Sequence, residues 1–387
     1  MELKPGYKQT EVGVLPEEWE VTTIGSEFSV QLGKMLDAEK NFGALRPYLG
    51  NRAVQWGRIA LEDMGLIKMS PLDLQRFRLK DGDLLVCEGG EIGRAAIWKQ
   101  PIEECYYQKA LHRLRPARGY NVTLMLNMLQ HWASTGYLFR FATQTGIAHL
   151  PKDKFETVPL PIPPTKAEQE AIAEALSDAD ALIESLDQLI AKKRHLKQGA
   201  MQELLTGKTR LPGFSGDWEV KRIGDLLSIS HGKSQTQVED RNGVYPILAS
   251  GGQIGLAKSY LYNQPSVLIG RKGTIDRPQY MDQPFWTVDT LFYSVIHAPN
   301  CAKYLFYQFC LIDWKQHNEA SGVPSLNAKT IERIEIAVPL ADEQTAIATI
   351  LSDMDTEIAA LEAQLTKTRQ IKQGMMAELL TGRTRLV

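Results

Sequence analysis

The sequence has 387 residues, of which 43% are hydrophobic and 23% charged, and its formal net charge is −2. The length predicts two to three domains, and the composition is ordinary for a soluble globular protein. The charge excludes a generally basic nucleic-acid coat protein, so any DNA binding must use local patches. No apolar run approaches the ~18 residues that a membrane span needs, and residues 1–20 lack the features of a signal peptide.

The four cysteines stand apart in the sequence and form no C-x-x-C pair. This spacing argues against a zinc site and against a disulfide framework, and it fits a protein of the reducing cytoplasm. The residues are Cys87, Cys105, Cys301 and Cys310.

Residues 1–164 are predicted to form a first domain, rich in β-structure with short helices. Asp81–Cys87 indicates a turn that leads into an apolar strand, and Gly89–Arg94 indicates a second turn. A helix is expected over Val122–Arg140. The prolines between residues 159 and 164 predict a stiff extended connector, since each proline fixes φ and blocks a helix.

A long repeat follows, because Glu168–Leu211 recurs as Glu343–Leu386 with roughly 25 of about 44 positions identical. Apolar residues in each copy fall at heptad spacing, which predicts a helix of about 39 residues, or ~58 Å. Acidic residues gather in the first half of each helix and basic residues in the second. We therefore expect the helices to pair as an antiparallel coiled coil; the alternative is two separate amphipathic helices, each on its own domain.

The second half of the chain repeats the plan of the first less literally. The segment around Trp218 echoes the one around Trp19, and Ser266–Ile275 is an apolar strand that runs into a basic, glycine-flanked turn. The predicted fold is α/β (α+β), with two domains separated by two long helices that form an antiparallel coiled coil. The predicted boundaries are 1–164 and 212–340 for the domains, and 165–211 and 341–387 for the helical regions.

Catalytic motifs are missing from the sequence. Gly207-Lys208-Thr209 resembles the end of a phosphate-binding loop, but Gln202 stands where that loop needs a glycine. His231-Gly232-Lys233-Ser234 fails for the same reason at Leu227. The sequence therefore predicts no catalytic residue and no metal site, although an enzyme with an unrecognised site remains an alternative.

Binding chemistry is concentrated in turns and polar loops. Arg271-Lys272-Gly273-Thr274 offers two cations, a glycine amide and a hydroxyl, the groups that hold phosphates and can read guanine edges. The alternative is that these residues have no binding role and are ordinary surface turns with solvated charges. The candidate DNA-binding residues are Arg94, Thr145, His149, Lys152, Lys233, Arg271, Lys272, Thr274, Ser321 and Asn327.

The layout resembles the specificity subunit of type I restriction-modification systems over essentially the whole chain. The most specific feature is a Glu-Gln pair after a proline-rich exit, present twice. Asp276 departs from the glycine expected just after the basic turn. The residues that carry the resemblance are Tyr48-Leu49, Asn51, Gly57, Ile59, Gly82–Leu85, Tyr245-Pro246, Ser250–Gly252, Ile269–Thr274, Val288–Phe292, Pro161–Pro164 with Glu168-Gln169 and Ile172, and Val338–Leu340 with Glu343-Gln344 and Ile347.

The resemblance implies a non-catalytic subunit that chooses where its partners act on double-stranded DNA. Each domain would contact one half of an asymmetric bipartite target. Two modification subunits, which bind S-adenosylmethionine and methylate adenine, would dock on the helices. Restriction subunits would add ATP- and Mg-dependent cleavage, so this chain itself is expected to bind no cofactor and no membrane. A competing hypothesis is an interaction scaffold that has no role at DNA.

Overall fold

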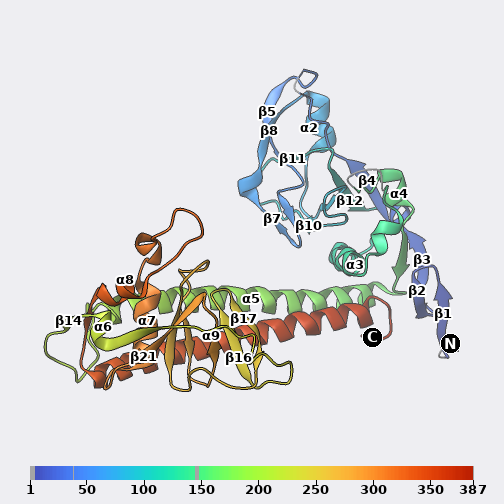
Figure 1. The fold of residues 1–387 in the computed structure, drawn as a ribbon. Helices are drawn as coiled ribbons and strands as arrows, with labels where there is room; N and C mark the ends of the chain where they lie inside the picture. Colours follow the sequence, from blue (N-terminus) through green and yellow to red (C-terminus); the bar gives the residue numbers. More distant parts are fainter. Residues whose placement is uncertain (1–4, 38, 144–147, 387) are drawn as a thin grey trace. The chain divides into compact units, whose positions relative to one another are not determined.

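The computed structural model describes residues 5–37, 39–143 and 148–386, and the chain divides into two compact units. The first unit comprises residues 1–186 and 364–387, and the second comprises residues 187–363. Each unit combines small sheets with helices, as the sequence predicts (Figure 1). In the described part of the chain, no helix has both the length and the apolar character that crossing a membrane requires.

The first unit is built around a four-stranded antiparallel sheet in the order β10-β9-β12-β4. Strand β9 is buried along its whole length, as its apolar sequence predicts. A second sheet, β11-β5-β8, shares an apolar core with the first, in which Leu49 and Tyr107 join Leu85 and Cys87. These strands are β4 (Phe28–Leu32), β5 (Ala44–Leu49), β8 (Gly65–Met69), β9 (Leu84–Cys87), β10 (Ala95–Ile97), β11 (Tyr106–Tyr107) and β12 (Leu111–Pro116).

Short ribbons and helices complete the first unit. The ribbons are β1 (Tyr7–Thr10) with β2 (Gly13–Pro16), β3 (Glu20–Thr23) with β13 (Pro159–Ile162), and β6 (Val54–Gln55) with β7 (Arg58–Ile59). The helices are α1 (Ile24–Glu27), α2 (Pro71–Phe77), α3 (Val122–Thr135) and α4 (Lys152–Glu156), with 3-10 turns at Leu61–Asp63 and Tyr137–Arg140.

One expectation for this unit was wrong in detail, and another was incomplete. The helix expected over Val122–Arg140 ends at Thr135, because Gly136 adopts a left-handed conformation with φ of 72° and closes it. Pro159–Ile162 is extended, as expected, but it pairs with β3 as a strand.

The second unit repeats this topology. Its four-stranded sheet has the order β15-β21-β18-β19, and its smaller sheet has the order β17-β16-β20. The strands are β14 (Glu219–Arg222), β15 (Leu227–His231), β16 (Tyr245–Ala249), β17 (Gly252–Ala257), β18 (Ser266–Gly270), β19 (Gln279–Met281), β20 (Trp286–Thr287), β21 (Leu291–Ile296) and β22 (Glu335–Val338). The helices are α6 (Ile223–Leu226), α7 (Ala302–Leu311) and α8 (Ala328–Arg333), with a 3-10 turn at Trp314–His317.

Two long helices, α5 (Lys166–Leu204) and α9 (Ala341–Leu379), have 39 residues each, as predicted. They lie side by side in Figure 1 and run antiparallel, since Lys372 Nζ lies 2.6 Å from Asp180 Oδ1 in the first unit and Lys197 binds Asp355 in the second. The predicted seam is buried or half-buried at every position. Its residues are Ile172, Leu176, Ala179, Ile183, Leu186 and Ile190 in α5, and Ile347, Leu351, Met354, Ile358, Leu361 and Leu365 in α9.

The glutamine of each repeated Glu-Gln pair joins a long helix to its domain. Gln169 accepts a hydrogen bond from the backbone N–H of Asn121, 3.1 Å away, at the start of α3. Gln344 accepts the corresponding bond from the N–H of Cys301, 3.0 Å away, at the start of α7. The side chains thereby satisfy backbone donors that a helix start leaves unpaired.

Candidate nucleic-acid interface

The basic turn, Arg271–Thr274, leaves the end of the wholly buried strand β18. Gly270 is required there, because a Cβ atom would lie 2.0 Å from the carbonyl oxygen of Thr274. Gly273 has φ of +86°, which glycine adopts without strain. The backbone of the turn is fixed, since Arg271 N donates to Thr290 O at 2.8 Å and Gly273 N donates to Pro324 O at 2.9 Å.

The two cations of this turn remain open to a ligand. In the part of the chain that the structure describes, the Arg271 side chain makes one hydrogen bond, from Nη1 to the backbone oxygen of Asp289 at 3.2 Å. Lys272 is exposed, and within the described residues its ammonium group has no hydrogen-bond or ion-pair partner. Both side chains line a hollow of about 290 Å³ together with Asn327 and Ser325. The structure therefore brings three of the predicted residues to one place.

Of the predicted residues of this unit, Asn327 lines the hollow, whereas Lys233, Ser321 and Thr274 do not. Asn327 has a second role, because its Oδ1 accepts a hydrogen bond from Lys329 N at 2.9 Å and caps α8. Lys233 is exposed and does not line the hollow, although its backbone is fixed to Thr287. Ser321 is exposed in the loop before α8.

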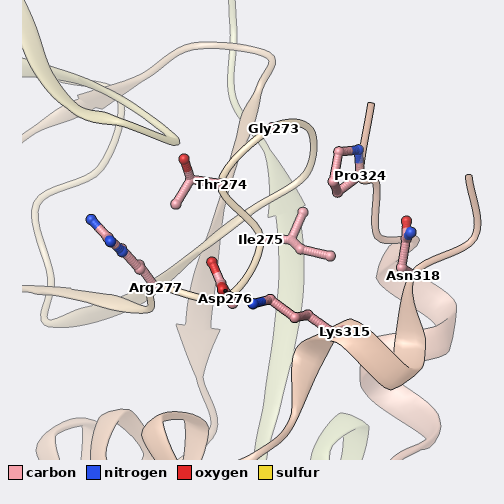
Figure 2. A pocket seen from close by; sticks show the side chains of 8 residues that line it. All are labelled: Gly273, Thr274, Ile275, Asp276, Arg277, Lys315, Asn318 and Pro324. Carbon is pink, nitrogen blue, oxygen red and sulfur yellow. Dashed lines mark ion pairs between the residues drawn. The ribbon is translucent and has the colours of Figure 1, made fainter. Parts of the chain in front are cut away.

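Thr274 lines a second, larger hollow of about 620 Å³ (Figure 2). Asp276 faces Lys315 there, with 3.1 Å between Oδ2 and Nζ, and the hydrogen bond from Lys315 lowers the pKa of the Asp276 carboxyl. The residue that replaces the expected glycine thus pairs with a cation. Arg277, which the sequence reading missed, extends away from this ion pair and is exposed.

The predicted residues of the first unit are held more tightly. The Arg94 guanidinium donates from Nη1 to Glu91 Oε2 at 3.1 Å and from Nη2 to the backbone oxygen of Asn51 at 2.8 Å. Lys152 Nζ lies 3.5 Å from Glu156 Oε1, one turn along α4. His149 is exposed and pairs through its backbone with Thr143. Thr145 lies outside the described residues.

A basic position in the first unit escaped the sequence reading. Gly33-Lys34 follows β4 as Gly232-Lys233 follows β15, and Lys34 N donates to Tyr107 O at 3.0 Å just as Lys233 N donates to Thr287 O at 2.8 Å. The signal was the Gly-Lys dipeptide after the same strand in both halves. Lys34, however, lies 2.9 Å from Asp73 Oδ2. Burial alone would raise the pKa of the Asp73 carboxyl, but hydrogen bonds from Lys34 and Ser70 outweigh it and lower that pKa.

An apolar row marks the outer face of α5. Leu182, Leu189 and Leu196 are spaced by seven residues, and their side chains are 46%, 38% and 48% exposed. Heptad spacing places them on one stripe of the helix, apart from the buried seam. Exposed apolar surface of this kind is typical of sites that bind another protein. We call these three residues the leucine row.

The described residues include no group of three or more His, Cys, Asp or Glu side chains arranged to hold a metal ion.

The sequence matches one protein family over most of its length. The family model described as the type I restriction modification DNA specificity domain matches residues 16–192 and 215–373. The type I restriction enzyme MjaVIII specificity subunit of Methanocaldococcus jannaschii is 24% identical, covering 96% of this chain and 94% of its own.

Two solved structures have a similar fold. One is the S subunit of the type I restriction-modification system of M. genitalium, with a TM-score of 0.66 and 16% identity over 98% of each chain. The other comes from work on complex assembly and conformational transition of a type I restriction-modification system, with a TM-score of 0.58 and 15% identity over 96% of this chain and 99% of that one.

Proposed function

Because this chain belongs to the family of type I restriction modification DNA specificity domains, with one match in each half, we propose that each of its two recognition domains binds one half of an asymmetric bipartite DNA target. The observation that carries this proposal is the shared topology of the two units, whose turns at the same place carry different side chains. Two domains of one fold with different contact residues would select two different half-sites. In this proposal residues 1–164 and 212–340 are the recognition domains, and residues 165–211 and 341–387 are the helical regions.

In the second domain, the basic turn would lie against the DNA. Arg271 and Lys272 would neutralise phosphates or donate to base edges, with Thr274, Lys233, Ser321 and Asn327 adding polar contacts. The open guanidinium and ammonium groups of the turn support this assignment.

In the first domain, His149, Lys152, Arg94 and Thr145 are the proposed contacts. The exposure of His149 supports its assignment. Arg94 would act mainly by fixing the turn against Asn51, since both of its terminal nitrogens already donate within the protein.

The chain would act without a catalytic centre of its own and direct the chemistry of its partners. Two modification subunits would bind along the paired helices and cover the leucine row, whose exposure supports a partner at this face. They would bring S-adenosylmethionine, and restriction subunits would bring the ATP- and Mg-dependent cleavage activity. The description of one structural neighbour in terms of complex assembly is consistent with this arrangement.

The test is methylome sequencing of cells that carry the complete system, together with a retention assay of the complex on DNA. We expect one bipartite motif, and binding that weakens steeply as salt rises because phosphate contacts release counterions. Binding to the partners without any sequence preference at DNA would support a scaffold instead. Methylation by this chain alone would support an enzyme.

A further inference from the structure

Glu88 in the first unit and Arg271 in the second occupy the same backbone position. Each is the first residue after the central buried strand of its sheet, β9 or β18. Glu88 N donates to Ala110 O at 3.0 Å, and Arg271 N donates to Thr290 O at 2.8 Å, in both cases one residue before β12 or β21 begins.

The carbonyl groups of Glu88 and Arg271, and the two residues after each of them, also have equivalent positions in the two units. Leu150 N donates to Glu88 O at 2.7 Å, and Leu326 N donates to Arg271 O at 2.9 Å. The next residue of each turn also pairs with the segment that contains this leucine. Gly89 forms an antiparallel bridge with His149, and Lys272 forms one with Ser325. One residue later, Gly90 and Gly273 have φ of 79° and 86°. The two turns therefore present their first side chain from the same point of the fold.

The chemistry at this position is opposite in the two domains. Arg271 is a donor with free N–H groups, since among the described residues only Nη1 of its side chain makes a hydrogen bond. Glu88 is an acceptor, and among the described residues its half-buried carboxylate makes no hydrogen bond or ion pair. Burial raises the pKa of the Glu88 carboxyl, and the nearby charges of His149 and Lys109 act in the opposite direction.

A partly desolvated carboxylate without a donor is costly, and a donor supplied by a ligand would offset that cost. Along DNA, the phosphates are anions and would repel Glu88. The exocyclic amino group of cytosine is the donor that acidic side chains accept from in the major groove, whereas arginine pairs with O6 and N7 of guanine.

We propose that this position determines specificity in both domains: Glu88 accepts a hydrogen bond from a cytosine amino group in the first half-site, and Arg271 donates to a guanine in the second. This inference rests on the proposed function, because it names residues that read the bases of the two half-sites. It also predicts that Glu88 matters for sequence choice more than for total affinity.

The first experiment is methylome sequencing of the complete system with Glu88→Gln, with Glu88→Ala, and with Glu103→Gln as the control. Glu103 is exposed in the same domain and its substitution removes the same charge. We expect both Glu88 variants to relax one position of the first half-site, while the second half-site and the spacing stay unchanged. Arg271→Gln should relax one position of the second half-site alone, and the control should keep the wild-type motif.

The second experiment tests the proposal even if the Glu88 variants do not fold, because it changes the DNA and keeps the wild-type protein. The wild-type complex is tested on DNA in which each cytosine of the first half-site is replaced in turn by a 2-pyrimidinone nucleoside that lacks the amino group. One replacement should weaken binding by about 5- to 150-fold. Equal binding at every position, or an unchanged first half-site in folded Glu88 variants, would overturn the inference. A wild-type system that yields no bipartite motif would instead overturn the proposed function.

Discussion

Arg210 binds both carboxylate oxygens of Glu343, with Nε and Nη2 each 2.7 Å from its acceptor. Arg385 binds Glu168 in the same bidentate way. The arginine that ends one copy of the repeat thus meets the glutamate that begins the other, and the glutamate side chains are 3% and 0% exposed. This explains why the two ends of the repeat are identical in both copies, since each pair needs one residue from each copy.

Loss of the Arg385 pair should destabilise the first unit. Arg385→Ala leaves the buried Glu168 carboxylate without its cation, and breaking a buried pair costs about 3 kcal/mol or more. Arg383→Ala is the control, because Arg383 pairs with Glu378 at 3.4 Å on the surface and such pairs contribute little. Urea unfolding of the two variants checks the difference. Equal unfolding midpoints would show that the Glu168 carboxylate is satisfied by other means.

Acidification should weaken the first unit through His112. Burial lowers the pKa of this histidine to about 4, and its Nε2 lies 2.8 Å from Leu150 O. Protons therefore bind the unfolded chain, with its ordinary pKa of about 6.5, before they bind the folded one. Stability should be lost as pH falls from about 6.5 to about 4, by up to about 1.4 kcal/mol per pH unit.

The control for this prediction is a substitution of His112 by the residue that the second unit has at the equivalent position, which is Phe292. Phe292 pairs with His231 at the end of β15 as His112 pairs with Leu32 at the end of β4. His112→Phe should flatten the dependence of the urea midpoint on pH within that window. A variant that keeps the wild-type slope would assign the acid sensitivity to other groups.

Removing the cations of the basic turn should weaken DNA binding by the whole complex. Arg271→Ala with Lys272→Ala should lower affinity and flatten the plot of log affinity against log salt by up to ~2 units, if both residues neutralise phosphates. Arg241→Ala with Lys258→Ala is the control, because it removes two exposed cations from the same unit. The assignment fails if affinity and slope match those of the control.

Because the leucine row is exposed, the chain without its partner should have low solubility and a low unfolding temperature. Co-expression with the modification subunit should raise its solubility and its unfolding temperature, because a partner that binds only the folded state stabilises it. Replacing Leu182, Leu189 and Leu196 with Gln should improve the isolated chain and reduce its binding to that subunit. Leu72→Gln, at a leucine that is 78% exposed in the first unit, should leave binding unchanged. Undiminished binding by the triple variant would place the partner elsewhere.

The paired helices should set the spacing between the half-sites. Insertion of one heptad after Leu186 and another after Leu361 keeps the seam in phase and lengthens each helix by ~10 Å. Since DNA rises ~3.4 Å per base pair, the spacer should grow by about three base pairs while both half-sites stay the same. Methylome sequencing of the altered system is the test. A changed half-site at constant spacing would mean that the helices help to read bases.

The long helices were predictable because their pattern repeats at every turn, and the seam residues Ile172, Leu186 and Ile358 are buried as expected. The strand pairing of Pro159–Ile162 was not predictable, because its partner β3 lies far away in the sequence. The local pattern likewise identified Arg94 as a cation on a turn, but it gave no sign that Nη2 of Arg94 binds the backbone oxygen of Asn51, 43 residues earlier. Contacts of that range depend on the completed fold.

Glu88 shows the same limit at the candidate site. Alone in the sequence it is one acidic residue before two glycines, with nothing to distinguish it from a solvated charge. Its correspondence to Arg271 emerges only from the hydrogen bonds to Ala110 and Leu150, which belong to two separate segments.

The apolar core of the first unit includes Met376, Leu379 and Leu380 near the end of α9, packed with Leu15 and Trp19 near the start of the chain. A ribosome therefore begins with the N-terminal domain but supplies the last part of its core only after it has made residues 187–363. Residues 187–363 form the second unit without any later segment. The domain translated second can thus complete its core before the domain that is translated first.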